Sequence, residues 1–235
     1  MFMTVIKGVV AVIALSMLSA CAGTYNAYID TLTLAFAKPT DISLTLADVQ
    51  AAKSDLLYVK RGERSQAAMA LLHIEAGQHK WVSGDKALLI IEQGRIVRTT
   101  GFSDNLLYLS NTGADAIRNV AAITPNSSWH RIADWQHGEY GYALQSTFLR
   151  QEQHALPFFQ HSFDTILVTE DVYYASDANF LRTDRNWKNY FWFDTASGTL
   201  IKSIQTLAPF AEPIEMIYIS RIARLLPADK AITHE

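Results

Sequence analysis

Histidine, serine and carboxylate side chains are the groups from which this chain could build a metal or catalytic site. It holds seven histidines, but none follows the H-x-x-x-H or H-E-x-x-H spacing that places two zinc ligands on one helical face. The G-x-S-x-G turn that exposes a hydrolase serine is also missing. We therefore predict no metal site, no bound cofactor and no serine nucleophile.

Acidic residues keep one hydrolytic mechanism open, because two carboxylates that share a cleft can cleave a glycosidic bond. The candidates are Asp134, Glu139, Glu170 and Asp171. Their spacing in the sequence does not by itself place them in one cleft. The main prediction is therefore a protein that is not an enzyme, with a periplasmic glycan hydrolase as an alternative.

Aromatic residues are concentrated in one short segment, NWKNYFWFD (186–194). Aromatic rings can stack on sugar rings, so Trp187, Tyr190 and Trp192 are candidate glycan contacts. In a strand, Tyr190 and Trp192 share one face because successive side chains alternate. Aromatic residues also dominate protein cores, so core packing is the alternative explanation of this segment.

Cys21 is the only cysteine, and it follows an apolar run (8–18) that begins after Lys7. A positive start, a short apolar run and small residues describe a secretory signal peptide. The run is about half as long as the ~20 residues that a membrane-spanning helix needs. The sequence LSAC (18–21) resembles the lipobox of bacterial lipoproteins, in which the thiol is joined to diacylglycerol. A free cysteine buried in a helix is the alternative.

The lipobox predicts cleavage before Cys21, a diacylglycerol on its thiol and an N-acyl chain, such as palmitate, on its amine. Two or more acyl chains hold a protein stably on a membrane. In bacterial lipoproteins an Asp after the cysteine commonly retains the protein at the inner membrane, and this chain has Ala22 there. We therefore expect an anchor in the outer membrane of a Gram-negative bacterium, with the folded domain in the periplasm.

The charge balance argues against a nucleic-acid partner. The formal net charge is −3, and no block of Lys and Arg supplies the clustered basic face that nucleic-acid binding needs. With Cys21 lipidated no disulfide can form, so packing must stabilise the fold.

The secondary structure predicted from the sequence is two helices followed by strands. Apolar residues at helical spacing predict a helix over 24–38, and a second short helix is expected over 46–53. Short apolar segments separated by turn residues then predict antiparallel hairpins. The predicted strands are DLLYVKRG, QAAMALLHIEAG, HKWVSGD, KALLIIEQG, RIVRTTG, YGYALQSTFLR, FDTILVTEDVYYA, KNYFWFD, TLIKSIQTL and PIEMIYISRI. A more polar middle, 102–136, interrupts them.

This pattern predicts three parts of the chain: a signal peptide (1–20), a lipid-anchored helical segment (21–54) and one β-rich domain (55–235). Two of the predicted hairpins, ALLIIEQGRIVRT and NYFWFDTASGTLIKS, have similar patterns in which Gly94 corresponds to Gly198. The similarity suggests a duplicated sheet, with a chance likeness of two hairpins as the alternative.

Features of a known family are spread over both halves of the chain. They are WVS (81–83) before an apolar strand, GRIVRTTG (94–101), the segment 189–194, Gly198 and Pro209. With the surrounding segments, 56–102 and 187–222, they resemble the YjbF/GfcB lipoproteins, the group 4 capsule polysaccharide lipoprotein family. The middle region, 103–160, matches this family less clearly.

The resemblance implies a largely antiparallel, bifurcated sheet curled into a pseudo-barrel, in agreement with the mainly β prediction. It also implies an outer-membrane lipoprotein that acts as a non-enzymatic accessory in exopolysaccharide or capsule production and export. The expected partners are the membrane, other polysaccharide-secretion or outer-membrane proteins, and the polysaccharide. Only Cys21 is carried over as a functional residue. A scaffold that pairs a sheet edge with another envelope protein is a further alternative.

Overall fold

The computed structural model describes residues 40–175 and 186–226. The chain divides into two units, Met1–Thr40 and Asp41–Glu235, and the description below concerns the second. The signal peptide, Cys21 and the predicted helix over 24–38 lie outside the described residues.

In the described residues, twelve antiparallel strands form one sheet, as the sequence pattern predicts for most of them. They are β1 (Leu56–Arg61), β2 (Ala67–Glu75), β3 (Gln78–Ser83), β4 (Leu88–Glu92), β5 (Arg95–Thr100), β6 (Leu106–Leu109), β7 (Ser128–Trp135), β8 (Glu139–Phe158), β9 (His161–Tyr174), β10 (Asn186–Asp194), β11 (Leu200–Gln205) and β12 (Ile214–Ile217). Their order is β5-β4-β3-β2-β1-β12-β11-β10-β9-β8-β7-β6. The last strand therefore pairs with the first, and β5 and β6 are the edges.

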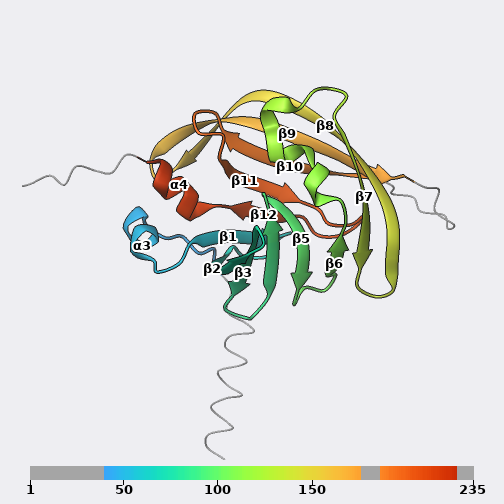
Figure 1. Ribbon diagram of the computed structural model, residues 1–235. Coiled ribbons are helices and arrows are strands. Elements are labelled where there is room, and N and C mark those ends of the chain that lie inside the picture. The colour runs from blue at the N-terminus through green and yellow to red at the C-terminus, as the bar shows by residue number, and fades with distance from the viewer. Residues whose placement is uncertain (1–39, 176–185, 227–235) are drawn as a thin grey trace, which may run out of the picture. The chain divides into compact units, whose positions relative to one another are not determined.

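The two edge strands, β5 and β6, lie side by side, so the sheet curls into a nearly closed barrel (Figure 1). Side chains join these edges in place of a regular ladder. The backbone N–H of Leu106 donates to Oγ1 of Thr99 (2.9 Å), and Nε of Arg98 donates to the carbonyl of Leu107 (3.0 Å). The mainly β fold predicted from the strand pattern and the barrel-like curvature implied by the family resemblance are both confirmed.

In the part of the chain that the structure describes, two short α-helices lie on the outer side of the sheet (Figure 1). The expected second helix is α3 (Leu46–Ala51), which starts with a capping box between Thr45 and Asp48. The other helix is α4 (Ile219–Leu225), where the sequence analysis extended the last strand to residue 222. That prediction was wrong because Ile219 and Ile222, spaced as on one helical face, pack in a core beneath the helices. Among the described residues, no helix is long and apolar enough to span a membrane.

The segment expected to be a polar middle contains two strands, β6 and β7, and the short helical turns η2 (Thr112–Ala114) and η3 (Ala116–Ala122). The alternation of β7 is regular: Trp129, Arg131 and Ala133 are buried, while Ile132 is exposed. The pattern was missed because an arginine points inward and an isoleucine points outward. The inward arginine shows that the interior is partly polar.

Candidate functional site

The charged residues inside the barrel form one network around Glu170 of β9. Arg95 of β5 lies 2.6 Å from Glu170 Oε2 through Nη1 and 2.7 Å from Asp115 Oδ2 through Nε. Arg131 of β7 lies 3.2 Å from Glu170 Oε1, and the hydroxyl of Ser146 donates to the same oxygen at 2.5 Å. All four charged side chains are buried. Residues from β5, β7, β8 and β9 are thereby tied together at the centre of the fold.

Glu170 remains ionised in this environment. Burial favours the neutral acid, but the charges of Arg95 and Arg131 outweigh burial, with hydrogen bonds from Asn189 and Ser146 adding to their effect. Together these groups hold the pKa of Glu170 at about 2. Because both carboxylate oxygens accept protein donors, we interpret Glu170 as a structural group.

Of the four carboxylates named as hydrolase candidates, the three whose side chains are described, Asp134, Glu170 and Asp171, do not share a cleft. Glu170 and Asp171 are neighbours in β9 and point to opposite faces, and Asp171 pairs with Lys188 at 2.9 Å on the outside. Asp134 accepts the backbone N–H of Gly141 at 2.7 Å. The side chain of Glu139 lies outside the described residues.

The three aromatic residues named as glycan contacts are divided between the two faces of β10. Trp187 points to the inner side, where its ring meets Tyr174 edge-on at 5.9 Å. Tyr190 and Trp192 share the outer face, with ring centroids 6.1 Å apart. Lys202 lies over Trp192 at 5.4 Å. Their contact with a glycan stays a prediction.

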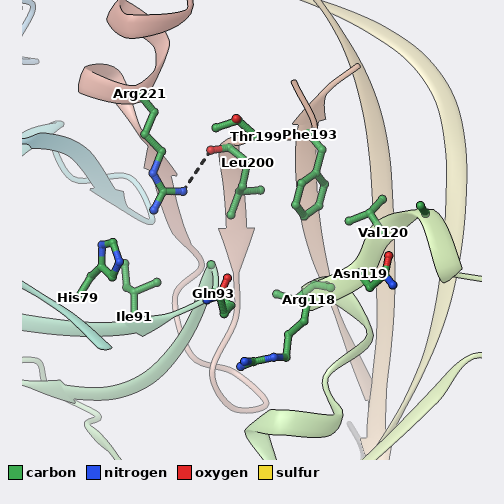
Figure 2. Close-up of a pocket in the computed structure, with 14 residues that line it drawn as sticks. His79, Ile91, Gln93, Arg118, Asn119, Val120, Phe193, Thr199, Leu200 and Arg221 are labelled. Carbon is green, nitrogen blue, oxygen red and sulfur yellow. Dashed lines mark hydrogen bonds between the residues drawn. The ribbon is translucent and has the colours of Figure 1, made fainter. Parts of the chain in front are cut away.

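A pocket of about 500 Å³ opens where two hairpin turns of the sheet meet η3 (Figure 2). The β4–β5 turn supplies Gln93 and Gly94, and the β10–β11 turn supplies Gly198 and Thr199. Strand β3 and helix α4 complete the wall. Its volume lies in the range of roughly 300–1,000 Å³ that is usual for small-ligand sites.

The two glycines that correspond in the sequence, Gly94 and Gly198, both line this pocket, and both have left-handed backbone conformations (φ +91° and +67°). Glycine adopts such conformations without steric cost. A Cβ on Gly94 would come within 2.5 Å of Leu200 Cδ2, whereas a Cβ on Gly198 would meet no atom within 4 Å. Gly94 is therefore required by packing as well as by conformation.

Three basic side chains surround the pocket, which we call the basic pocket: His79 from β3, Arg118 from η3 and Arg221 from α4. Figure 2 shows the two arginines on opposite sides of the opening. Arg118 pairs with Glu92 at 2.9 Å. Burial, together with the charge of Arg221, lowers the pKa of His79, and Asp55 partly opposes this shift.

Arg221 differs from Arg118 in its partners. Its guanidinium stacks on the ring of Tyr218 at 4.2 Å and donates one long hydrogen bond, 3.4 Å, to the carbonyl of Leu200. No carboxylate of the described residues lies within ion-pair distance of Arg221. Within the described segments, most of its N–H donors are therefore without a partner.

A second hollow, of about 310 Å³, lies beside Trp135, Tyr174 and the loop that carries Phe210. Phe210 is 79% exposed and has a left-handed backbone (φ 64°). The basic and acidic residues around this hollow are His137 and Asp104. Since it lacks converging cations, we take the basic pocket as the candidate functional site.

The sequence analysis did not identify His79, Arg118 or Arg221 as a site. The one sequence signal that pointed toward it was the similarity between the two hairpins, whose glycines both line the pocket. Among the described residues, no cluster of three or more His, Cys, Asp or Glu side chains is arranged to hold a metal ion.

Comparisons with known proteins agree on one family. The family model described as "Group 4 capsule polysaccharide lipoprotein gfcB, YjbF" matches residues 29–219. The chain is 28% identical over 204 residues to a protein named uncharacterized lipoprotein GfcB from Escherichia coli (strain K12), covering 86% of this chain and 92% of that protein. It is 26% identical over 206 residues to the uncharacterized lipoprotein YjbF of the same strain, with the same coverage of 86% and 92%.

A solved structure is also similar. The crystal structure of the hypothetical lipoprotein YmcC from Escherichia coli (K12) aligns with a TM-score of 0.66 and 29% sequence identity. The alignment covers 79% of this chain and 90% of YmcC.

Proposed function

Because this chain belongs to the group 4 capsule polysaccharide lipoprotein family of GfcB and YjbF, we propose that it is a lipid-anchored, non-enzymatic accessory of capsule or exopolysaccharide export at the outer membrane. The observation that carries this proposal is the family match over residues 29–219, which starts shortly after the lipobox cysteine, Cys21. Family membership supports a capsule-related role and a membrane-anchored place in the cell envelope.

The geometry of the acidic residues supports the non-enzymatic part of the proposal. A glycosidase needs two carboxyl groups that face the same sugar. Here Glu170 is enclosed by protein donors, and Asp171 points to the opposite face. The nearly closed sheet also gives less support to a scaffold that works by strand addition, because β5 and β6 lie against each other.

The decisive experiment combines deletion of the gene with restoration of either the natural chain or Cys21→Ser. Deletion is expected to reduce the polysaccharide recovered outside the cell, and the natural chain is expected to restore it. Cys21→Ser removes the thiol that would carry diacylglycerol, so the variant should leave the membrane fraction and fail to restore export.

The proposal is wrong if deletion leaves the amount of external polysaccharide unchanged under conditions in which the polymer is made. The hydrolase alternative is tested by single substitutions Asp134→Asn, Glu139→Gln, Glu170→Gln and Asp171→Asn. A change in polymer chain length, with normal amounts of folded protein, would favour the hydrolase over the accessory role.

A further inference from the structure

We propose that the basic pocket binds a sugar unit that carries a carboxylate, with Arg221 as its main anion-binding residue. The preference for an anion follows from the charges of the pocket. The sugar class rests on the proposed function, which this inference deepens.

The two arginines of α4 show why Arg221 is the ligand-binding candidate. Arg224 donates to both carboxylate oxygens of Asp55, at 2.6 and 2.9 Å. Arg221, one turn earlier in the same helix, has no such partner among the described residues and lines the pocket. A guanidinium binds a carboxylate through two parallel N–H donors, which gives both strength and a defined orientation. Arg221 can therefore bind a ligand carboxylate in the same two-donor geometry in which Arg224 binds the carboxylate of Asp55.

Stacking on an aromatic ring orients Arg221 before any ligand arrives. Its guanidinium lies 4.2 Å from the centre of the Tyr218 ring, and Tyr218 is almost completely buried. The ring therefore limits the motion of the guanidinium without using its N–H donors. Less side-chain freedom is then lost when an anion binds.

Arg118 adds a second positive group from the opposite wall (Figure 2). It pairs with Glu92, which also accepts the hydroxyl of Thr112 at 3.0 Å. This pairing neutralises part of the charge of Arg118 and holds its side chain in place. Arg118 therefore contributes less attraction than Arg221 but helps to orient a charged group that spans the opening.

The remaining lining residues suit a sugar better than a bare inorganic ion. Gln93, Asn119 and Thr199 offer amide and hydroxyl groups to sugar hydroxyls, while Phe193 and Leu200 provide an apolar wall. Ligand sites usually combine a largely apolar lining with a few placed polar groups. A small anion would use the arginines and leave most of the volume of about 500 Å³ unfilled.

The test uses the full chain purified in a non-ionic detergent and two tetrasaccharide probes, tetragalacturonate and the neutral maltotetraose. Binding is measured by calorimetry at low salt. Tetragalacturonate should bind at least about 10-fold more tightly than maltotetraose. Arg221→Gln should weaken its binding by about 10-fold, which corresponds to about 1.4 kcal/mol.

Arg150→Gln is the matched control, because Arg150 is exposed on β8 and does not line the pocket. It removes the same charge and should leave binding unchanged. Both variants should unfold at the same denaturant concentration as the natural chain, so that a loss of binding does not reflect a loss of folding.

Three outcomes would overturn the inference: equal binding of both tetrasaccharides, equal effects of Arg221→Gln and Arg150→Gln, or full competition by acetate at the same concentration of carboxylate. Failure here is distinguishable from failure of the proposed function. A deletion strain that loses external polymer, with a protein that does not bind tetragalacturonate, keeps the accessory role and refutes this inference. Specific binding with unchanged export would refute the accessory role alone.

Discussion

The barrel interior and the basic pocket each contain an arginine stacked on an aromatic ring, Arg95 and Arg221, and these two arginines differ in their carboxylate partners. Inside, Arg95 lies 4.9 Å from the ring centre of Trp129 and 4.8 Å from that of Phe191, and it pairs with both Asp115 and Glu170. At the pocket, Arg221 stacks on Tyr218 and has no carboxylate partner among the described residues.

This difference separates a structural charge from one that is available for binding. Burying an ion pair carries a large desolvation cost, so each buried charge must be paired with an opposite charge and hydrogen-bonded. An arginine at the wall of a pocket keeps contact with solvent, so its N–H donors can be without a protein partner. Residue type and aromatic stacking alone therefore do not identify a binding arginine, whereas the set of partners does.

The largest expected effect comes from removing the acidic centre of the interior network. Glu170→Gln leaves Arg131 without a charged partner and removes one of two partners of Arg95. We expect a loss of about 3–5 kcal/mol in the free energy of unfolding, measured with denaturant. The control is Asp171→Asn, which breaks an exposed pair on the opposite face and should cause no measurable change. Equal losses in the free energy of unfolding for Glu170→Gln and Asp171→Asn would contradict the distinction between the buried network and the exposed ion pair.

The same network predicts an acid dependence of stability. The pKa of Glu170 in the fold is about 2, below its ordinary value of 4.5. Since a depressed carboxyl pKa stabilises the fold above the unfolded value, this contribution is present at neutral pH and is lost as pH falls from 4.5 toward 2. The free energy of unfolding, measured from about pH 5 to about pH 3, should decrease more steeply for the natural chain than for Glu170→Gln. Parallel curves would show that Glu170 does not contribute in this way.

A smaller effect is expected at the turns that border the pocket. Gly94→Ala adds a Cβ that meets Leu200 as well as the cost of a left-handed alanine, so we expect a loss of about 1–3 kcal/mol in the free energy of unfolding. Gly198→Ala has the conformational cost without the contact and should lose less. Displacement of Leu200 should also weaken tetragalacturonate binding in Gly94→Ala. Equal losses of stability in Gly94→Ala and Gly198→Ala would show that the Leu200 side chain can move aside without an energetic cost.

The smallest expected effect concerns the protonation of His79. The charged groups that act on it are Arg221 and Asp55, while Ile74 and Ile91 face it from the neighbouring strands. The pKa of His79 is lowered by burial and by the charge of Arg221. A bound anion that offsets this charge should raise the pKa of His79, so that the imidazole takes up a proton when the anion binds. Tetragalacturonate should then bind several-fold more tightly at about pH 5 than at about pH 8. His79→Gln should abolish this pH dependence, and a dependence that persists in the variant would assign it to another group.

Much of the fold could be predicted from local pattern. Alternating apolar residues identified most strands, and α3 was expected because its helical pattern is local. Strand β7 was missed because Arg131 is buried and Ile132 is exposed, which reverses the usual pattern. Helix α4 was missed because an apolar segment of its length fits either a strand or a helix, and packing in the core beneath the helices decides between them.

By itself, the sequence determined most of the hairpins, the glycines that their turns require and the lipobox from which the anchor at Cys21 is predicted. These are properties of neighbouring residues, so no knowledge of the rest of the chain is needed. Only the tertiary structure decided that β3, η3 and α4 place His79, Arg118 and Arg221 around one pocket. It also decided that Glu170 is enclosed while its neighbour Asp171 stays at the surface, because burial and ion pairing depend on which distant strands the curled sheet brings together.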